Sequence, residues 1–306
     1  MKSGVIKCWS RVFGLAALVA GGSTLQAAAQ SEEGRVGQSA PWQLNFQEPA
    51  TQMMAQITDL HQLMLWIMAV VSVFVMVLLV IVIMRFNRKA NPTPSKFTHN
   101  SLLEFVWTAV PVVILVIIAI PSVRLLQLQE DFDKVEPDLV IKATGYQWYW
   151  GYEYPDQQIE FESLMLGLGY PEMNDEVREE LAEYGYPETA WKLATDTAVV
   201  VPIDTTVLMQ VTAADVIHAW TIPAFGVKVD AIPGRLNQTW FRAEQIGTFY
   251  GQCSELCGKN HSYMPITVKV VSQEDYDAWL EEAKEEFGTA DAGAAPAQVA
   301  TATTAN

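Results

Sequence analysis

The sequence predicts a mixed membrane and β protein, in which a two-helix transmembrane hairpin is followed by an exported β-sandwich. Residues 63–84 and 105–123 contain no charged side chain, and each stretch is long enough to cross a hydrocarbon core of about 30 Å as a helix. Between residues 137 and 272, β-branched and aromatic runs bounded by Pro, Gly and Asp predict strands. Several strands in about 130 residues are typical of a sandwich or barrel.

Residues 1–29 have the pattern of a cleaved secretory signal. Basic residues precede the short apolar run VFGLAALVA, and small residues end the segment at Ala27–Ala29, as signal cleavage requires. We therefore expect Gln30 to be the mature N-terminus. The alternative is a short membrane anchor, but this apolar run is too short to span a bilayer.

The segment 30–124 contains the predicted hairpin, with helices at about 63–84 and 103–124. The loop between them, RFNRKANPTPSKFTH, carries four basic residues and no acidic one. The positive-inside rule places this loop in the cytoplasm and both chain ends on the exported side. A secretory signal requires the same orientation.

Residues 125–287 form the predicted exported domain, and this part of the chain is strongly acidic. Residues 125–306 contain 30 Asp and Glu against 10 Lys and Arg, in a chain with a formal net charge of −16. An acidic surface favours solubility or the steering of a basic partner. The same sign of charge excludes nucleic acid as a partner.

Helical patterns occur at two places in this domain. Asn174 is a candidate N-cap and Gly185 a candidate stop for a short helix, and residues 273–288 predict a second helix that closes the domain. We expect the Ala- and Thr-rich tail, residues 288–306, to be disordered.

The stretch GQCSELCGKNHSYM concentrates the soft donor atoms of the chain. It contains Cys253, Cys257, His261 and Met264, whereas the third cysteine, Cys8, lies in the predicted signal. A lone pair of cysteines in an exported protein forms a disulfide by default. The histidine and the methionine beside this pair favour a metal site instead.

His218, in DVIHAWTIPAFG, is the second candidate imidazole. Loops at one end of a sandwich converge from distant strands, so we expect it near the other donors. Structural zinc needs only two Cys and two His, and blue copper needs one Cys, two His and a weak axial Met. Two coppers that share both thiolates use the whole set, if Met264 and the backbone carbonyl of Glu255 serve as weak fourth ligands.

Four segments carry a family resemblance: HNSLLEFVWTAVP, GYQWYWGYEYP, DVIHAWTIPAFGVKVDAIPGR and CSELCGKNHSYM. In this order they resemble subunit II of the bacterial-type haem-copper cytochrome c oxidases, over about residues 45–285. The resemblance implies a cupredoxin-like β-sandwich on the periplasmic side of the bacterial inner membrane. It also implies a dinuclear copper centre, CuA, that accepts electrons from cytochrome c. Haem in subunit I then reduces O₂ to water, coupled to proton pumping, and subunit III is a further expected partner.

The resemblance implies roles for single residues as well. Trp148, in the aromatic run GYQWYWGYEYP that reads as a strand, is the exposed ring through which electrons enter. Glu104 begins a proton-uptake path, and the side chain of Glu255 binds magnesium at the boundary with subunit I. Tyr146 stands where many relatives have His. The implied copper ligands are His218, Cys253, the carbonyl of Glu255, Cys257, His261 and Met264.

Acidic side chains are the implied docking residues for cytochrome c, whose exposed haem edge is rich in lysine. Opposite charge would speed and orient the encounter. The residues are Glu153, Asp196 and Asp215, with Glu160 and Glu162 as further candidates.

Two competing functions follow from the same residues. A quinol oxidase subunit would lack the copper ligands, all of which are present here. A membrane-tethered copper chaperone or thiol oxidoreductase would need an exchangeable site or a reactive thiolate. Neither property explains the two-helix anchor together with Trp148.

Overall fold

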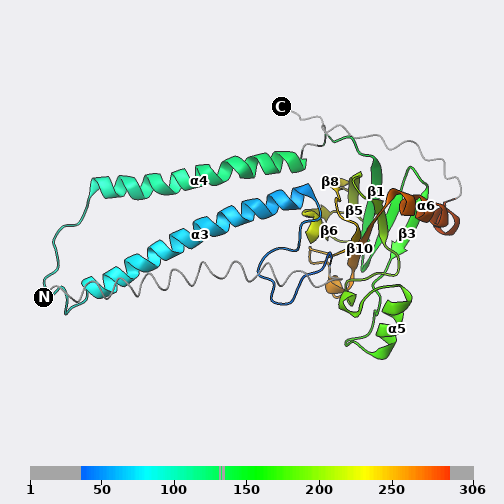
Figure 1. Cartoon of the computed structure of the whole chain (residues 1–306), viewed down its shortest axis with the longest axis horizontal. Coiled ribbons are helices and arrows are strands. Elements are labelled where there is room, and N and C mark those ends of the chain that lie inside the picture. Colours follow the sequence, from blue (N-terminus) through cyan, green and yellow to red (C-terminus); the bar gives the residue numbers. More distant parts are fainter. Residues whose placement is uncertain (1–35, 131, 133–134, 290–306) are drawn as a thin grey trace.

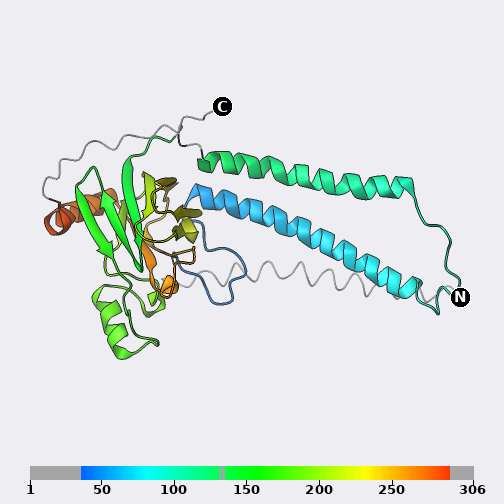
Figure 2. The same ribbon diagram turned by 180° about the vertical axis from the view of Figure 1, so that it is seen from behind.

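The computed structural model describes residues 36–130, 132 and 135–289. Two long helices run side by side from a β-rich domain, the β-domain (residues 135–289), as Figures 1 and 2 show. α3 spans Gln52–Arg85 and α4 spans Ser101–Glu130. Both are long and apolar enough to cross a membrane, and the most apolar window of each is 0% buried. Lipid or partner subunits must therefore cover the hairpin.

Both helices extend beyond the apolar runs that predicted them. α3 begins early because the Thr51 hydroxyl accepts a hydrogen bond from the Met54 amide at 3.0 Å, which caps the helix. Met53 and Met54 in its first turn are buried. An apolar run identifies only the part of a helix that lies in the hydrocarbon core of the membrane. It therefore does not predict the helical turns on either side of that core.

The β-domain contains three sheets. The five-stranded sheet has the order β3-β2-β1-β5-β8, the three-stranded sheet β4-β10-β9, and the two-stranded sheet β6-β7. Alternate residues of β1 and β5 are buried, as expected for strands with one face in a core. This arrangement confirms the predicted β-sandwich. The strands are β1 Leu139–Tyr146, β2 Tyr149–Tyr154, β3 Ile159–Ser163, β4 Val199–Pro202, β5 Thr206–Ala213, β6 His218–Ile222, β7 Val227–Ala231, β8 Asn237–Arg242, β9 Gly247–Gln252 and β10 Pro265–Val271.

Two helices of the β-domain lie where the sequence predicts them. α5 spans Asp175–Glu183, and the Asn174 side chain accepts a hydrogen bond from the Val177 amide at 2.8 Å. α6 spans Gln273–Phe287 and is capped by Ser272. The predicted signal, residues 1–29, and most of the predicted tail lie outside the described residues.

The start of α3 is joined directly to the β-domain. The Ala50 amide donates to the Ala224 carbonyl at 2.9 Å, and the Thr51 hydroxyl donates to the Phe225 carbonyl at 2.8 Å. Gly226 has a φ of 70°, and a Cβ at this position would lie 2.7 Å from Cδ1 of Ile57. Both the backbone conformation and the close approach of α3 therefore favour glycine here.

Candidate metal centre

Four donor side chains come from one short segment, the donor loop (residues 253–264). It follows β9 and passes through a 3₁₀ turn, His261–Tyr263, into β10. Sγ of Cys257 lies 3.5 Å from Nδ1 of His261 and 3.5 Å from Sδ of Met264. Both cysteines and Met264 are buried. The loop thus gathers two sulfurs, an imidazole and a thioether around one point.

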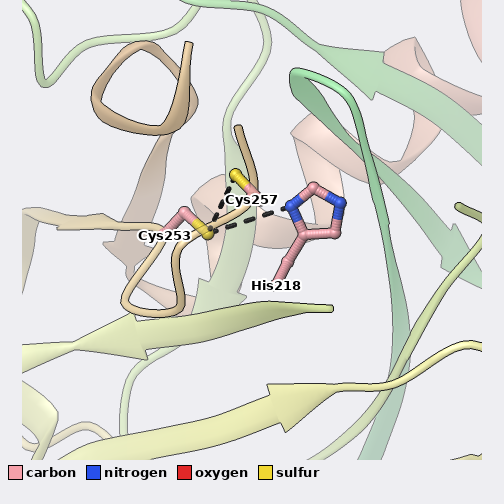
Figure 3. Close-up of side chains that lie close together, drawn as sticks. All are labelled: His218, Cys253 and Cys257. Atoms are coloured by element: carbon pink, nitrogen blue, oxygen red, sulfur yellow. Dashed lines mark hydrogen bonds between the residues drawn. The ribbon is translucent and has the colours of Figure 1, made fainter. Parts of the chain in front are cut away.

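His218 reaches the same point from the first position of β6. Its side chain is 0% exposed, and Nδ1 lies 3.9 Å from Sγ of Cys253. The donor atoms of His218, Cys253 and Cys257 all lie within 4.8 Å of one another, and Figure 3 shows the three side chains pointing together. The long-range pairing expected from convergent loops is present.

The two cysteines are free thiols. Their sulfurs are 3.8 Å apart, whereas a disulfide bond is about 2.05 Å long. The structure therefore places two separate sulfur donors side by side rather than one disulfide, and a metal can lie between them.

The backbone of the donor loop supplies a further oxygen. The Glu255 carbonyl lies 3.2 Å from Sγ of Cys253, and the Glu255 side chain is exposed. One residue thus presents its carbonyl to the cluster and its carboxylate to the surface.

The two thiols differ in their ease of ionisation. Burial raises the pKa of Cys253, but hydrogen bonds with His218, His261 and the backbone of Glu255 and Ala219 together outweigh burial and lower this pKa to about 7. Burial and the charge of Cys253 raise the pKa of Cys257 to about 12. Two adjacent thiolates repel each other, so bound cations are required for both to be ionised at neutral pH.

Asp215 fixes the His218 ring from the side opposite the sulfurs. Its carboxylate accepts hydrogen bonds from Nε2 of His218 at 2.9 Å, the Gln147 amide at 2.7 Å and the Val216 amide at 2.6 Å. A proton held on Nε2 leaves Nδ1 free to face Cys253. Sequence reasoning missed this contact, although an acid three residues before a candidate ligand could have suggested it.

The turn between β1 and β2 packs on the donor loop. Nε2 of Gln147 donates to the Cys257 carbonyl at 2.9 Å, and Nε1 of Trp148 donates to the same oxygen at 3.1 Å. A Cβ at Gly258 would lie 3.2 Å from both side chains. Gln147 is a residue that sequence reasoning missed, and no local pattern marks it.

Trp148 is not on a strand and is not fully exposed, contrary to the sequence-based expectation. It lies in this turn and is half-buried against the main core. Tyr149 stacks on Tyr146, with ring centroids 4.7 Å apart. Trp150 is fully buried, and its ring centroid is 6.0 Å from that of His218. Because Trp148 lies in the turn between β1 and β2 and not on a strand, strand alternation does not set its direction.

Two of the other acidic candidates, Glu153 and Asp196, have partners of their own. Glu153 pairs with Lys142 at 2.5 Å. Asp196 accepts from the Leu164 amide at 2.8 Å and from the Thr197 amide at 2.6 Å. Glu104 is exposed in the first turn of α4, and α4 begins at the end of the hairpin far from the β-domain (Figure 1).

The donor set suits a soft metal. Thiolate and thioether sulfur favour copper, and imidazole is also a good copper ligand. The residues present therefore fit a copper site chemically.

The comparisons with known families decide what kind of protein carries this cluster. Residues 139–271 match the family model for the cytochrome c oxidase subunit II periplasmic domain, and residues 39–125 match the model for its transmembrane domain. This chain belongs to the cytochrome c oxidase subunit II family.

Curated relatives are consistent with this family. Cytochrome c oxidase subunit 2 of Cereibacter sphaeroides is 52% identical over 275 residues, which are 89% of each chain. Probable cytochrome c oxidase subunit 2 of Rickettsia bellii is 46% identical over 241 residues, 78% of this chain and 84% of the relative. The crystal structure of the periplasmic domain of subunit II from Bradyrhizobium japonicum is 49% identical, with a TM-score of 0.42, and covers 50% of this chain and 99% of that one.

Membership of the cytochrome c oxidase subunit II family identifies the chain as a component of an oxidoreductase complex. It is a membrane protein with a periplasmic-type domain, and its partner is a haem-copper oxidase. Copper binding and electron transport follow from the family, and the buried cluster of His218, Cys253 and Cys257 could hold a metal.

Proposed function

We propose that this chain is the electron-accepting subunit of a terminal oxidase and that it binds a dinuclear copper centre, CuA. The ligands are His218, Cys253, the carbonyl of Glu255, Cys257, His261 and Met264. One observation carries the proposal: two unbonded sulfurs 3.8 Å apart have an imidazole on each side. When bound, the copper pair accepts one electron at a time from cytochrome c.

The residues around the cluster fix the positions of its ligand side chains. The buried His218 ring is fixed by Asp215, and Cys253 and Cys257 are buried beneath the turn that carries Gln147. Rigid ligands need to move little when charge changes, so a preorganised cluster favours rapid electron transfer.

In this proposal Trp148 is the point at which electrons enter from cytochrome c. Its indole nitrogen donates a hydrogen bond to the carbonyl of Cys257, one of the proposed ligands. This contact links the ring to the cluster through one hydrogen bond and the backbone of a single residue.

Cytochrome c docks, on this proposal, against the acidic surface that includes Asp215, Glu153 and Asp196. The expected contribution of each differs, because each has a different intramolecular partner. Asp215 and Asp196 accept hydrogen bonds from backbone amides, which are neutral and do not cancel the charge of a carboxylate. Glu153 is paired with Lys142, which offsets its charge.

The remaining assignments concern the complex. The haem-containing subunit I reduces O₂ to water with coupled proton pumping, and subunit III is a further partner. Glu104 begins a proton-uptake path, and the exposed Glu255 carboxylate contributes to a magnesium site at the boundary with subunit I. The β-domain and the N-terminus lie on the periplasmic side of the inner membrane, with the basic loop between α3 and α4 in the cytoplasm.

Reduction by cytochrome c tests the function directly. The full chain in detergent micelles is loaded with copper and mixed with reduced cytochrome c, and haem absorbance is followed by stopped flow. We expect oxidation of the haem at a rate that falls with added salt. Trp148→Leu should slow the reaction at every salt concentration without loss of copper. No haem oxidation by the copper-loaded chain would refute the proposal.

A further inference from the structure

The segment immediately before α3 carries exposed apolar side chains that the proposed electron-transfer function does not use. This apolar loop (residues 36–47, VGQSAPWQLNFQ) contains no charged residue. Trp42 is 97% exposed, Leu44 82% and Phe46 42%. Several large apolar side chains facing outward from one short loop mark a surface that contacts something less polar than water.

Both ends of the apolar loop are anchored to the β-domain. Gly37 accepts a hydrogen bond from the Tyr250 amide at 3.3 Å, and a Cβ at Gly37 would lie 2.5 Å from the backbone of Phe249. At the other end, the Ala50 amide donates to the Ala224 carbonyl. Both ends are therefore held on the β-domain, and the loop between them projects on the side of the hairpin (Figures 1 and 2).

Hydrogen bonds inside the apolar loop satisfy several of its polar groups. The Ala40 amide donates to Oε1 of Gln43 at 2.8 Å, the Gln43 amide donates to the Ala40 carbonyl at 3.2 Å, and Nε2 of Gln43 donates to the Phe46 carbonyl. Polar groups that already have partners cost less to remove from water. Trp42 has a φ of 62°, which is unusual for a bulky residue. The turn thus presents its indole outward at a conformational cost.

The position of the apolar loop along α3 indicates what it contacts. The Phe46 ring packs on the His61 ring with centroids 4.6 Å apart. His61 lies two residues before Leu63, where the charge-free run of α3 begins, a rise of about 3 Å along the helix. The headgroup layer on each side of the hydrocarbon core is about 5–8 Å thick. Phe46 is therefore at the level of the headgroups, where Trp side chains are enriched in membrane proteins.

We propose that the apolar loop is an interfacial membrane contact, in which Trp42 and Leu44 enter the lipid headgroup layer of the leaflet beside the β-domain. The contact is continuous with the membrane-spanning part of α3 through Phe46 and His61. It gives the β-domain a third attachment to the bilayer beside the two helices, and so restrains its tilt above the membrane surface.

Spin-label depth measurements test this proposal. Trp42→Cys and Leu44→Cys are each labelled with a nitroxide in the full chain, reconstituted in vesicles of phosphatidylethanolamine and phosphatidylglycerol. Ala278→Cys, at an exposed position of α6, is the matched control, and the unsubstituted chain corrects for labelling of Cys253 and Cys257. Accessibility to oxygen, which concentrates in lipid, is compared with accessibility to a water-soluble nickel chelate. Since the replaced side chains are almost fully exposed, neither substitution removes a packing contact.

We expect oxygen accessibility to exceed nickel accessibility at positions 42 and 44, and the reverse at position 278. Nickel accessibility at 42 and 44 as high as at 278 would show that the loop faces water and would overturn the proposal. The same labels are then measured in the assembled oxidase in the same vesicles. Protection from both reagents, with an immobilised spectrum, would mean that a partner subunit covers the loop and would equally overturn it.

Discussion

The cluster of candidate metal ligands is built from two regions that differ in how the chain positions them. The donor loop brings Cys253, Cys257, His261 and Met264 together within one short stretch, and its geometry follows from the 3₁₀ turn and the start of β10. His218 comes from β6, where Asp215 orients its ring locally, and it meets Cys253 from a distant part of the sequence. Short spacing thus defines one half of the site, and tertiary hydrogen bonds define the other.

The contacts on the His218 side form a connected set. Asp215 binds both Nε2 of His218 and the Gln147 amide, and the Gln147 side chain binds the Cys257 carbonyl. Gly145 approaches His218 so closely that a Cβ there would lie 2.9 Å from the ring. The β1–β2 turn therefore links the distant histidine to the donor loop, and substitutions on the two sides should have different consequences.

The largest effect is expected within the donor loop. Cys257→Ser removes a sulfur that contacts Cys253, His261 and Met264. The remaining donors match a mononuclear site, so copper bound per chain should fall from two to about one, measured by metal analysis after gel filtration. Ser254→Ala, in the same loop, is the control and should keep both coppers. Two coppers retained by the Cys257→Ser chain would contradict the role of this sulfur as a bridge.

A smaller effect is expected on the His218 side from Asp215→Asn. The carboxamide is uncharged and orients the imidazole less strongly, and loss of such a partner typically weakens metal affinity about 10- to 100-fold. Competition with a copper chelator measures this change. Asp156, an acid exposed in the turn after β2, provides the control variant Asp156→Asn, for which no change is expected.

The same Asp215→Asn chain separates positioning from docking. If Asp215 also steers cytochrome c, the loss of turnover should be greatest at low salt, because screening weakens steering at high salt. A turnover loss that is independent of salt would leave Asp215 with the positioning role alone.

Gln147→Leu should affect electron transfer without removing copper. It deletes one of the two side-chain hydrogen bonds to the Cys257 carbonyl, and a neutral hydrogen bond is worth about 1 kcal/mol, or roughly fivefold in a rate if fully expressed. Stopped-flow reduction by cytochrome c should slow by up to about fivefold. Gln252→Leu, at an exposed position just before the donor loop, is the matched control. If Gln147→Leu instead weakened copper binding as much as Asp215→Asn, Gln147 would be needed to position the copper ligands.

The smallest effect is expected from Glu153→Gln. Lys142 already offsets this charge at the surface, and exposed ion pairs contribute about 0–1 kcal/mol. The second-order rate constant with cytochrome c at low salt should change less than about twofold. A larger fall in this rate constant for Glu153→Gln than for Asp215→Asn would contradict the account, because Glu153 would then contribute more to docking than Asp215.

Much of the fold was predictable because it rests on local patterns. Charge-free runs marked α3 and α4, Asn174 marked the start of α5, and β-branched runs marked the strands. The tight spacing of Cys253, Cys257, His261 and Met264 likewise indicated a metal site. In each case the feature is determined by a few residues that are close together in the sequence.

Most of the contacts that escaped prediction join distant parts of the chain, and the exception is the hydrogen bond between Asp215 and His218, three residues apart. Gln147 and Trp148 bind the carbonyl of Cys257 more than a hundred residues away, and the Asp215 carboxylate binds the Gln147 amide. No spacing rule encodes such pairs. The placement of Trp148 was wrong for the same reason, since a turn interrupts the aromatic run that reads as one strand.

Electron paramagnetic resonance of the copper-loaded full chain tests most directly the claim that two metal ions share the sulfurs of Cys253 and Cys257. We predict a spectrum in which one unpaired electron couples to two equivalent copper nuclei, and which disappears in the Cys257→Ser chain. Hyperfine splitting from a single copper nucleus in the unsubstituted chain would contradict the claim and indicate a mononuclear site.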